Sequence, residues 1–233
     1  RGSNTQVDTF NTQFGTGMTL HGGNNDGDIL ALQTAGGYTV NLAAGTVSLT
    51  GSSGTMSIID IEKVRSFNGN YADLFIATTG PNEFNGYLGT DTLDYYQGNG
   101  SNLAGINLTV NLTAASGLVN GWASTDTLLG IENIITGKGD DIFLLTNDTI
   151  ASDLDGRDGA DTASYAASGV AATVTMTSEV LATGQTGSTV DTLRNIETFI
   201  YRVDGTVQRQ KFQTHQGVAL LKPLQHGPQK FDG

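Results

Sequence analysis

Aspartates that follow glycine-rich turns are the residues with the clearest capacity for chemistry in this sequence. The segments "GYLGTDTLDYY" (86–96) and "GRDGADTASYA" (156–166) place Asp91 and Asp161 two residues after one glycine and five after another. Carboxylate and turn carbonyl oxygens are the ligands that Ca²⁺ prefers, six to eight of them at about 2.3–2.6 Å. The same residues also have a mechanical use, because glycine supplies positive φ and aspartate accepts hydrogen bonds from its own turn. The pattern leaves a calcium site and a structural turn as alternatives.

The turns belong to a repeat of about 65–70 residues, a spacing that indicates stacked structural units. A Gly–Asp turn with a short strand, a strand with alternating apolar residues, and a segment containing Ile-Glu recur three times in this order. The turn aspartates are spaced by 63 and 70 residues and the glutamates by 70 and 65. The residues at these landmarks are Asp28, Asp91 and Asp161, and Glu62, Glu132 and Glu197. We expect the repeated glutamates to form a structural ladder rather than a catalytic site.

The repeat predicts an all-β fold, a parallel β-roll or β-solenoid with glycine-rich turns on one side. Each copy has too few apolar residues to close its own core, so it must stack on its neighbours. Stacked strands would place Leu30, Leu93 and Ala163 in equivalent inward positions. Asp60 and Gly130 in the Ile-Glu segments favour a bent corner. We expect an N-terminal lead-in (1–21), a three-repeat roll (22–201, with copies 22–85, 86–155 and 156–201) and a C-terminal tail (202–233).

Composition and charge exclude several functional classes. The chain lacks cysteine, so neither disulfides nor thiolate metal sites are possible, and no apolar run approaches the length of a membrane span. The net charge is −12. Residues 1–201 carry 21 acidic and 6 basic groups (net −15), and residues 202–233 carry 2 acidic and 5 basic groups (net +3). The acidic charge of residues 1–201 disfavours nucleic-acid binding, which requires clustered Lys and Arg, and favours cations as partners.

The glycine and aspartate pattern resembles the nonapeptide G-G-x-G-x-D-x-(apolar)-x of the repeats-in-toxin, or haemolysin-type calcium-binding, family. The similarity covers roughly residues 22–200 and is strongest around 126–166. Three turns match with one glycine replaced: Tyr87 and Arg157 stand at the second glycine, and "TGKGDDIF" (136–143) lacks the first. Asn82 and Ser152 stand where the preceding register would carry aspartate. The resemblance implies one to three calcium sites and secretion before calcium-driven folding.

The metal-site residues that the resemblance implies lie in these three turns. The turns at Asp28 and Asp73 match the pattern less closely. The candidate residues are Gly86, Gly89, Asp91, Gly137, Gly139, Asp141, Gly156, Asp158, Gly159 and Asp161.

Other chemistry has weaker support. The three histidines do not have the spacing of a zinc site. Glycosidases need two carboxylates at a defined separation, but among 18 Asp and 5 Glu some pair will have that separation by accident. We therefore expect no catalysis from this chain; an enzyme acting on acidic polysaccharide is the least favoured alternative. Trp122 and four tyrosines could form a sugar-stacking face, although such residues more often pack a core. The tyrosines are Tyr71, Tyr87, Tyr95 and Tyr96.

The sequence thus predicts a secreted or cell-surface, calcium-binding repeat module with a structural or adhesive role. The alternative is a carbohydrate-binding or self-assembling surface-layer or adhesin module, with glycans or cell-surface components as partners. A basic tail on an acidic body also suggests self-association, with the tail of one copy docked on the body of another.

Overall fold

Strands and turns make up the whole of the described chain. The computed structural model contains no helix within the residues it describes, and so none that is long and apolar enough to cross a membrane. The structure describes residues 2, 6–24, 27–67, 69–97, 106–113, 116–122, 124–146, 151–178, 180–203 and 205–211.

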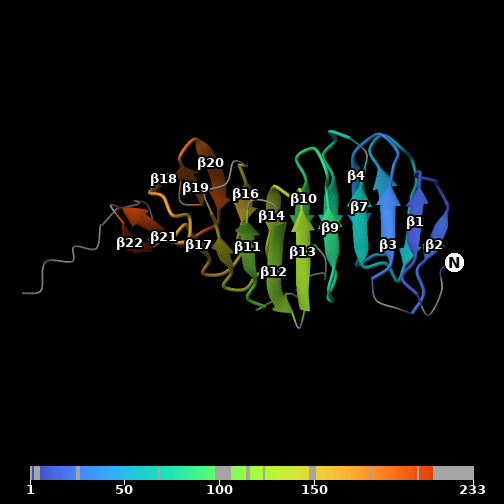
Figure 1. Cartoon of the computed structure of the whole chain (residues 1–233), viewed down its shortest axis with the longest axis horizontal. Helices are drawn as coiled ribbons and strands as arrows, with labels where there is room; N and C mark the ends of the chain where they lie inside the picture. The colour runs from blue at the N-terminus through green and yellow to red at the C-terminus, as the bar shows by residue number, and fades with distance from the viewer. Residues whose placement is uncertain are drawn as a thin grey trace, which may run out of the picture.

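The described strands form two long mixed sheets, here called sheet A and sheet B, with eleven strands in each. Figure 1 shows the strands of each sheet following one another along the long axis, from the blue N-terminal end to the orange C-terminal end. In spatial order, sheet A contains β1 (Thr9–Thr12), β3 (Ile29–Leu32), β7 (Lys63–Ser66), β9 (Glu83–Asn85), β13 (Ser124–Leu129), β12 (Ser116–Trp122), β11 (Thr109–Thr113), β15 (Ile142–Leu144), β17 (Thr162–Ser164), β21 (Thr198–Val203) and β22 (Thr206–Lys211). Sheet B contains β18 (Ala172–Ser178), β19 (Leu181–Thr186), β20 (Thr189–Arg194), β16 (Asp153–Asp155), β14 (Asn133–Ile135), β10 (Thr92–Asp94), β8 (Leu74–Ile76), β4 (Tyr38–Asn41), β5 (Thr46–Leu49), β6 (Met56–Ile59) and β2 (Thr19–His21).

The chain winds alternately between the two sheets, and strands on successive turns of the winding pair in parallel, as β8, β10, β14 and β16 do in sheet B. This confirms the predicted all-β roll or solenoid. Three antiparallel meanders interrupt the winding and make both sheets mixed, which the repeat pattern did not predict: β4–β5–β6, β11–β12–β13 and β18–β19–β20.

Successive repeats start in opposite sheets. The Gly–Asp strand of the repeat is β3 in sheet A, β10 in sheet B and β17 in sheet A. The first repeat visits the sheets with β3, then the meander β4–β6, then β7, β8 and β9, which is five visits. An odd number of visits leaves the next copy in the other sheet.

The turns therefore line two edges of the roll rather than the single side that the sequence analysis expected. Turns that lead from sheet B into sheet A lie along one edge, the A-start edge. Turns that lead from sheet A into sheet B lie along the opposite edge, the B-start edge. The turn at 156–161 joins β16 to β17 and lies on the A-start edge, whereas the turn at 86–91 joins β9 to β10 and lies on the B-start edge.

A single apolar core fills the space between the sheets, with inward residues stacked in rows. In sheet B, for example, Leu93, Ile134, Leu154 and Leu193 are paired in register and fully buried. The equivalent inward residues Leu30, Leu93 and Ala163 are all buried as predicted, although in different sheets. The rings of Phe75 in β8 and Phe84 in β9, with centroids 5.7 Å apart, meet across the two sheets.

The bent corner predicted in the Ile-Glu segments is present in all three copies. Asp60, Gly130 and Asn195 have φ values of 52°, 56° and 52°, in the left-handed region where a side chain is strained. The sheets also extend past the expected boundaries of the roll. β1 and β2 belong to it within 1–21, and the β21–β22 hairpin continues sheet A to Lys211. Residues 212–233, which include most of the basic tail, lie outside the described residues.

Candidate functional site

The turn aspartates form ladders along both edges of the roll. Each of them occupies the position just before a strand and is buried: Asp28, Asp73, Asp91, Asp141 and Asp161. In each case one carboxylate oxygen accepts a hydrogen bond from the main-chain N–H at the same position of a neighbouring strand. The carboxylate thus supplies the acceptor that a buried N–H group at the end of a strand would otherwise lack.

On the A-start edge, Asp161 belongs to a run of three such hydrogen bonds. Asp161 Oδ1 accepts the Asp141 N–H at 2.7 Å, and Asp141 Oδ1 accepts the Leu108 N–H at 2.6 Å. The Asp161 N–H in turn donates to Glu197 Oε2 at 2.7 Å. Farther along the same edge, Asp28 Oδ1 accepts the N–H of Asp8 at 2.7 Å.

The B-start edge repeats the arrangement. Asp73 Oδ1 accepts the Tyr38 N–H at 2.6 Å, and Asp91 Oδ1 accepts the Asp73 N–H at 2.8 Å. The Asp91 N–H donates to Glu132 Oε2 at 2.9 Å. On the A-start edge, Glu62 Oε2 accepts the N–H of Asp28 at 3.0 Å. The three repeated glutamates therefore make equivalent structural contacts, which confirms the ladder that their spacing predicted.

The second carboxylate oxygen of the repeat aspartates has no such partner. Oδ2 of Asp28, Asp91 and Asp161 is buried without a hydrogen bond. In each repeat two oxygen atoms lie against the Cα of the first turn glycine: this Oδ2 and a main-chain carbonyl oxygen of the bent corner. A Cβ on Gly86 would lie 2.2 Å from Asp91 Oδ2 and 2.3 Å from the Gly130 carbonyl oxygen. The first glycine of the motif is thus required by close approach, not by its φ angle, since any side chain would collide.

Burial raises the pKa of two of these carboxyl groups, Asp91 and Asp161. Burial raises the pKa of Asp161 to about 8; the hydrogen bond from the Asp141 N–H opposes this rise, and repulsion from Asp141 and Glu197 adds to it. The pKa of Asp91 rises to about 7 for the same principal reason. An ionised carboxylate at either position is costly in the absence of a nearby positive charge.

The candidate metal residues are divided between the two edges. Gly137, Gly139 and Asp141 share the A-start edge with the turn of Gly156, Asp158, Gly159 and Asp161, and the two turns touch: a Cβ on Gly159 would lie 2.1 Å from the Gly139 carbonyl oxygen. Asp140 Oδ1 also accepts the Ala160 N–H between them, at 2.9 Å. Gly86, Gly89 and Asp91 lie on the B-start edge and stack instead on the turn before Asp73, where a Cβ on Gly89 would lie 2.2 Å from the Tyr71 carbonyl oxygen.

The residues that replace the second glycine of the motif adopt a backbone conformation that favours glycine. Tyr87 and Arg157 have φ values of 71° and 65°. Each N–H donates to the side chain two residues earlier, Asn85 Oδ1 or Asp155 Oδ1, at 3.0 Å. These hydrogen bonds support the turn, but a left-handed backbone still costs about 1–2 kcal/mol with a side chain.

Two further aspartates in the ladders were missed by the sequence analysis. Asp126 Oδ1 accepts the Asn82 N–H at 2.8 Å and Asp191 Oδ1 accepts the Ser152 N–H at 3.0 Å. Their second oxygens accept the hydroxyl hydrogens of Tyr95 and Tyr165, at 2.8 and 2.7 Å. The tripeptide Asp-Thr-Leu, which occurs at residues 91–93, 126–128 and 191–193, is the signal that could have found them.

Carboxylate and imidazole side chains alone do not build a metal site in the described part of the chain, where no three of these side chains converge on one point. Bound Ca²⁺ would therefore need main-chain carbonyl oxygens as additional ligands. Such a shell is compatible with the preference of Ca²⁺ for carbonyl and carboxylate oxygens.

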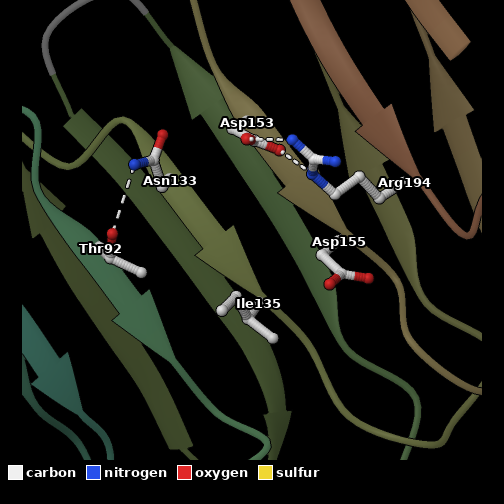
Figure 2. A pocket seen from close by; sticks show the side chains of 6 residues that line it. All are labelled: Thr92, Asn133, Ile135, Asp153, Asp155 and Arg194. Atoms are coloured by element: carbon white, nitrogen blue, oxygen red, sulfur yellow. Dashed lines mark hydrogen bonds and ion pairs between the residues drawn. The ribbon is translucent and has the colours of Figure 1, made fainter. Parts of the chain in front are cut away.

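A groove of about 160 Å³ crosses the outer face of sheet B (Figure 2). Arg194 donates to both carboxylate oxygens of Asp153, at 2.9 and 3.0 Å, and Asn133 donates to Thr92 Oγ1 at 3.3 Å. Asp155 accepts a hydrogen bond from Asn195 Nδ2 at 2.7 Å. Because both carboxylates are already paired, the groove has the character of a solvent-facing strand surface rather than of an acid–base site.

The predicted sugar-stacking face is divided by the fold. Tyr95 is buried in the core, and Tyr96 lies on the A-start edge beneath the cations of Arg157 and Lys138, 5.1 and 5.9 Å from its ring centroid. Tyr71 and Tyr87 lie together on the B-start edge and are exposed. The side chain of Trp122 is outside the described residues.

No protein-family model matches the chain, and no curated protein shows significant similarity to it.

Proposed function

We propose that this chain is an extracellular repeat module with a structural or adhesive role, whose folding is stabilised by Ca²⁺. The observation that carries the proposal is the pair of buried carboxylate ladders, which join successive turns of an elongated roll. Every step of a ladder connects neighbouring strands, so the ladders resist separation of the turns along the axis. The location outside the cell rests on the resemblance of the Gly–Asp turns to secreted repeats.

The donor chemistry of the stacked turns on the A-start edge fits Ca²⁺. They bring Asp140, Asp141, Asp158 and Asp161 into two adjacent turns, together with main-chain carbonyls and without sulfur or imidazole. Asp158 and Asp161, which belong to one turn, would hold the ion with these carbonyl oxygens, because no three carboxylates of the described residues converge on one point. Calcium would supply the positive charge that the buried ladder lacks and would lower the pKa of Asp161.

Thermal unfolding tests the calcium part of the proposal. We expect millimolar CaCl₂ to raise the Tm above the value in chelator, with MgCl₂ giving a smaller shift because Mg²⁺ requires stricter octahedral geometry. Saturation at about 100 times Kd would add roughly 2.7 kcal/mol to the free energy of unfolding.

Variants locate the ion. Asp158→Asn changes an exposed carboxylate of the stacked turns without removing a described ladder bond, and it should weaken the calcium response. Asp153→Asn, on the outer face of sheet B, is the matched control and should keep the response. An identical Tm in chelator, calcium and magnesium would refute calcium stabilisation and leave the ladders as purely mechanical elements.

A further inference from the structure

Exposed aromatic side chains gather at one place on the B-start edge. Among the described residues, the exposed aromatic side chains are Phe67, Tyr71 and Tyr87, at 44%, 44% and 51% exposure, and Leu88 beside them is 53% exposed. They come from two neighbouring turns, after β7 and after β9, which a parallel bridge between Asn70 and Leu88 joins. The rings of Phe67 and Tyr87 meet edge to face with centroids 5.7 Å apart. We call these four residues the aromatic patch.

Tyr87 occupies its place in the patch at the expense of backbone strain. Its φ of 71° lies in the left-handed region that suits glycine, and it stands where the calcium-binding pattern has glycine. Arg157 has the same conformation in the equivalent turn, but its side chain pairs with Asp155 at 3.3 Å and lies over Tyr96. The Tyr87 ring remains half exposed, so packing within the protein offsets little of the energetic cost of the strained backbone. Strained backbone positions cluster at functional sites, which makes Tyr87 a candidate for a binding role.

The two turns that carry the patch contain no charged side chain of their own, and Glu132 of the adjacent bent corner accepts the Asp91 N–H. Neither residues 66–72 nor residues 84–90 contain a charged side chain, in a chain whose net charge is −12. The nearest aspartates along the chain, Asp73 and Asp91, are buried in the ladder. The exposed polar groups beside the patch include Asn70 and Thr90, an amide and a hydroxyl.

We propose that the aromatic patch binds an uncharged glycan. A pyranose ring has one apolar C–H face, which stacks on an aromatic ring, and a rim of hydroxyl groups, which pair with amides and hydroxyls. A patch whose own turns carry neither cations nor anions suits neutral sugars better than uronates or phosphates, which would need a basic side chain. This inference deepens the adhesive role proposed above, because it supplies the surface through which the module would attach.

Affinity electrophoresis through gels that contain soluble polysaccharide tests the inference on the full chain. The probes are neutral polymers, namely dextran, laminarin and galactomannan, with alginate as the anionic control. We expect at least one neutral polymer to retard the protein and alginate to leave its mobility unchanged. Tyr87→Gly should weaken the retardation at least tenfold, and Tyr71→Ala should also reduce it. Tyr96→Ala, a tyrosine substitution on the opposite edge, should retain it.

Tyr87→Gly also separates binding from folding. Glycine accepts the left-handed backbone, so the Tm of this variant should equal or exceed that of the wild type while binding is lost. Absence of retardation by every neutral polymer, or retardation that survives in Tyr87→Gly, would overturn the proposal. So would concentration-dependent dimerisation in sedimentation velocity that disappears in Tyr87→Gly, which would assign the patch to a protein contact. The calcium melts are independent of all these outcomes.

Discussion

The main-chain N–H of Asp141 donates a 2.7 Å hydrogen bond to Oδ1 of Asp161, its counterpart just before the neighbouring strand β17. The other oxygen of the same carboxylate, Oδ2, is buried without a hydrogen bond. One side chain thus combines a stabilising contact with a costly one. The two contributions can be separated by substitution.

Asp161→Asn and Asp161→Ala should have opposite consequences in chelator. Asparagine keeps an acceptor for the Asp141 N–H and replaces the unpartnered oxygen by an amide, so the free energy of unfolding at pH 8 should equal or exceed that of the wild type. Alanine leaves a buried N–H unpaired and should lower it by about 1–3 kcal/mol. Urea denaturation measures both. Equal losses in the two variants would contradict the hydrogen-bond role.

Gly86→Ala should destabilise the protein through a steric collision. The added Cβ would lie 2.2 Å from Asp91 Oδ2 and 2.3 Å from the Gly130 carbonyl oxygen, so the backbone must move, at a cost of about 3 kcal/mol. Gly15→Ala is the matched control. A Cβ there meets only Met18 at 3.6 Å, an ordinary contact, and the change should stay within about 0.5 kcal/mol. Similar denaturation midpoints for the two variants would refute the close-approach explanation.

Asp126 should make the stability fall as pH rises. Burial raises the pKa of Asp126 to about 6 in the folded protein, despite the hydrogen bonds from Asn82 and Tyr95 that lower it. The folded state therefore holds the proton more tightly than the unfolded state, whose pKa is near 3.9. The contribution is fully present below pH 4 and is lost as pH rises through 6, on the order of 3 kcal/mol.

The comparison of wild type with Asp126→Asn isolates this effect from other titrating groups. The difference in free energy of unfolding between the two proteins should shift in favour of the variant between pH 4 and pH 7. Denaturation with guanidinium chloride at several pH values, in chelator, provides the measurement. A difference that stays constant over this range would show that Asp126 is ionised in the folded protein throughout.

Tyr165→Phe should destabilise the roll by about 2–3 kcal/mol. The Tyr165 hydroxyl donates to Asp191 Oδ2 at 2.7 Å in the core, and its removal takes a hydrogen bond away from a buried carboxylate. Tyr95→Phe should behave in the same way, because Tyr95 makes the equivalent bond to Asp126. Tyr201→Phe serves as the control. Its hydroxyl donates to Gln210 at a partly exposed position, so the loss should be below about 1 kcal/mol.

The sequence by itself determined the features that depend on local chain geometry. The three repeats, the inward positions of Leu30, Leu93 and Ala163, and the bent corners at Asp60 and Gly130 follow from side-chain alternation and from backbone preference. The spacing of Glu62, Glu132 and Glu197 indicated a structural ladder. Each of these depends on residues within one segment, or on the constant interval between equivalent segments.

Only the tertiary structure decided which segments meet. Each of the first two repeats makes five visits to the sheets, and this odd number places Asp91 and Asp161 on opposite edges, although their local sequences are nearly the same. The ladder contacts of Asp126 and Asp191, and the gathering of Phe67, Tyr71 and Tyr87, likewise depend on strand pairings between distant segments. The physical reason is that alternation fixes the face of a strand on which a side chain lies. The neighbouring strand is chosen by hydrogen bonds and core packing between distant parts of the chain.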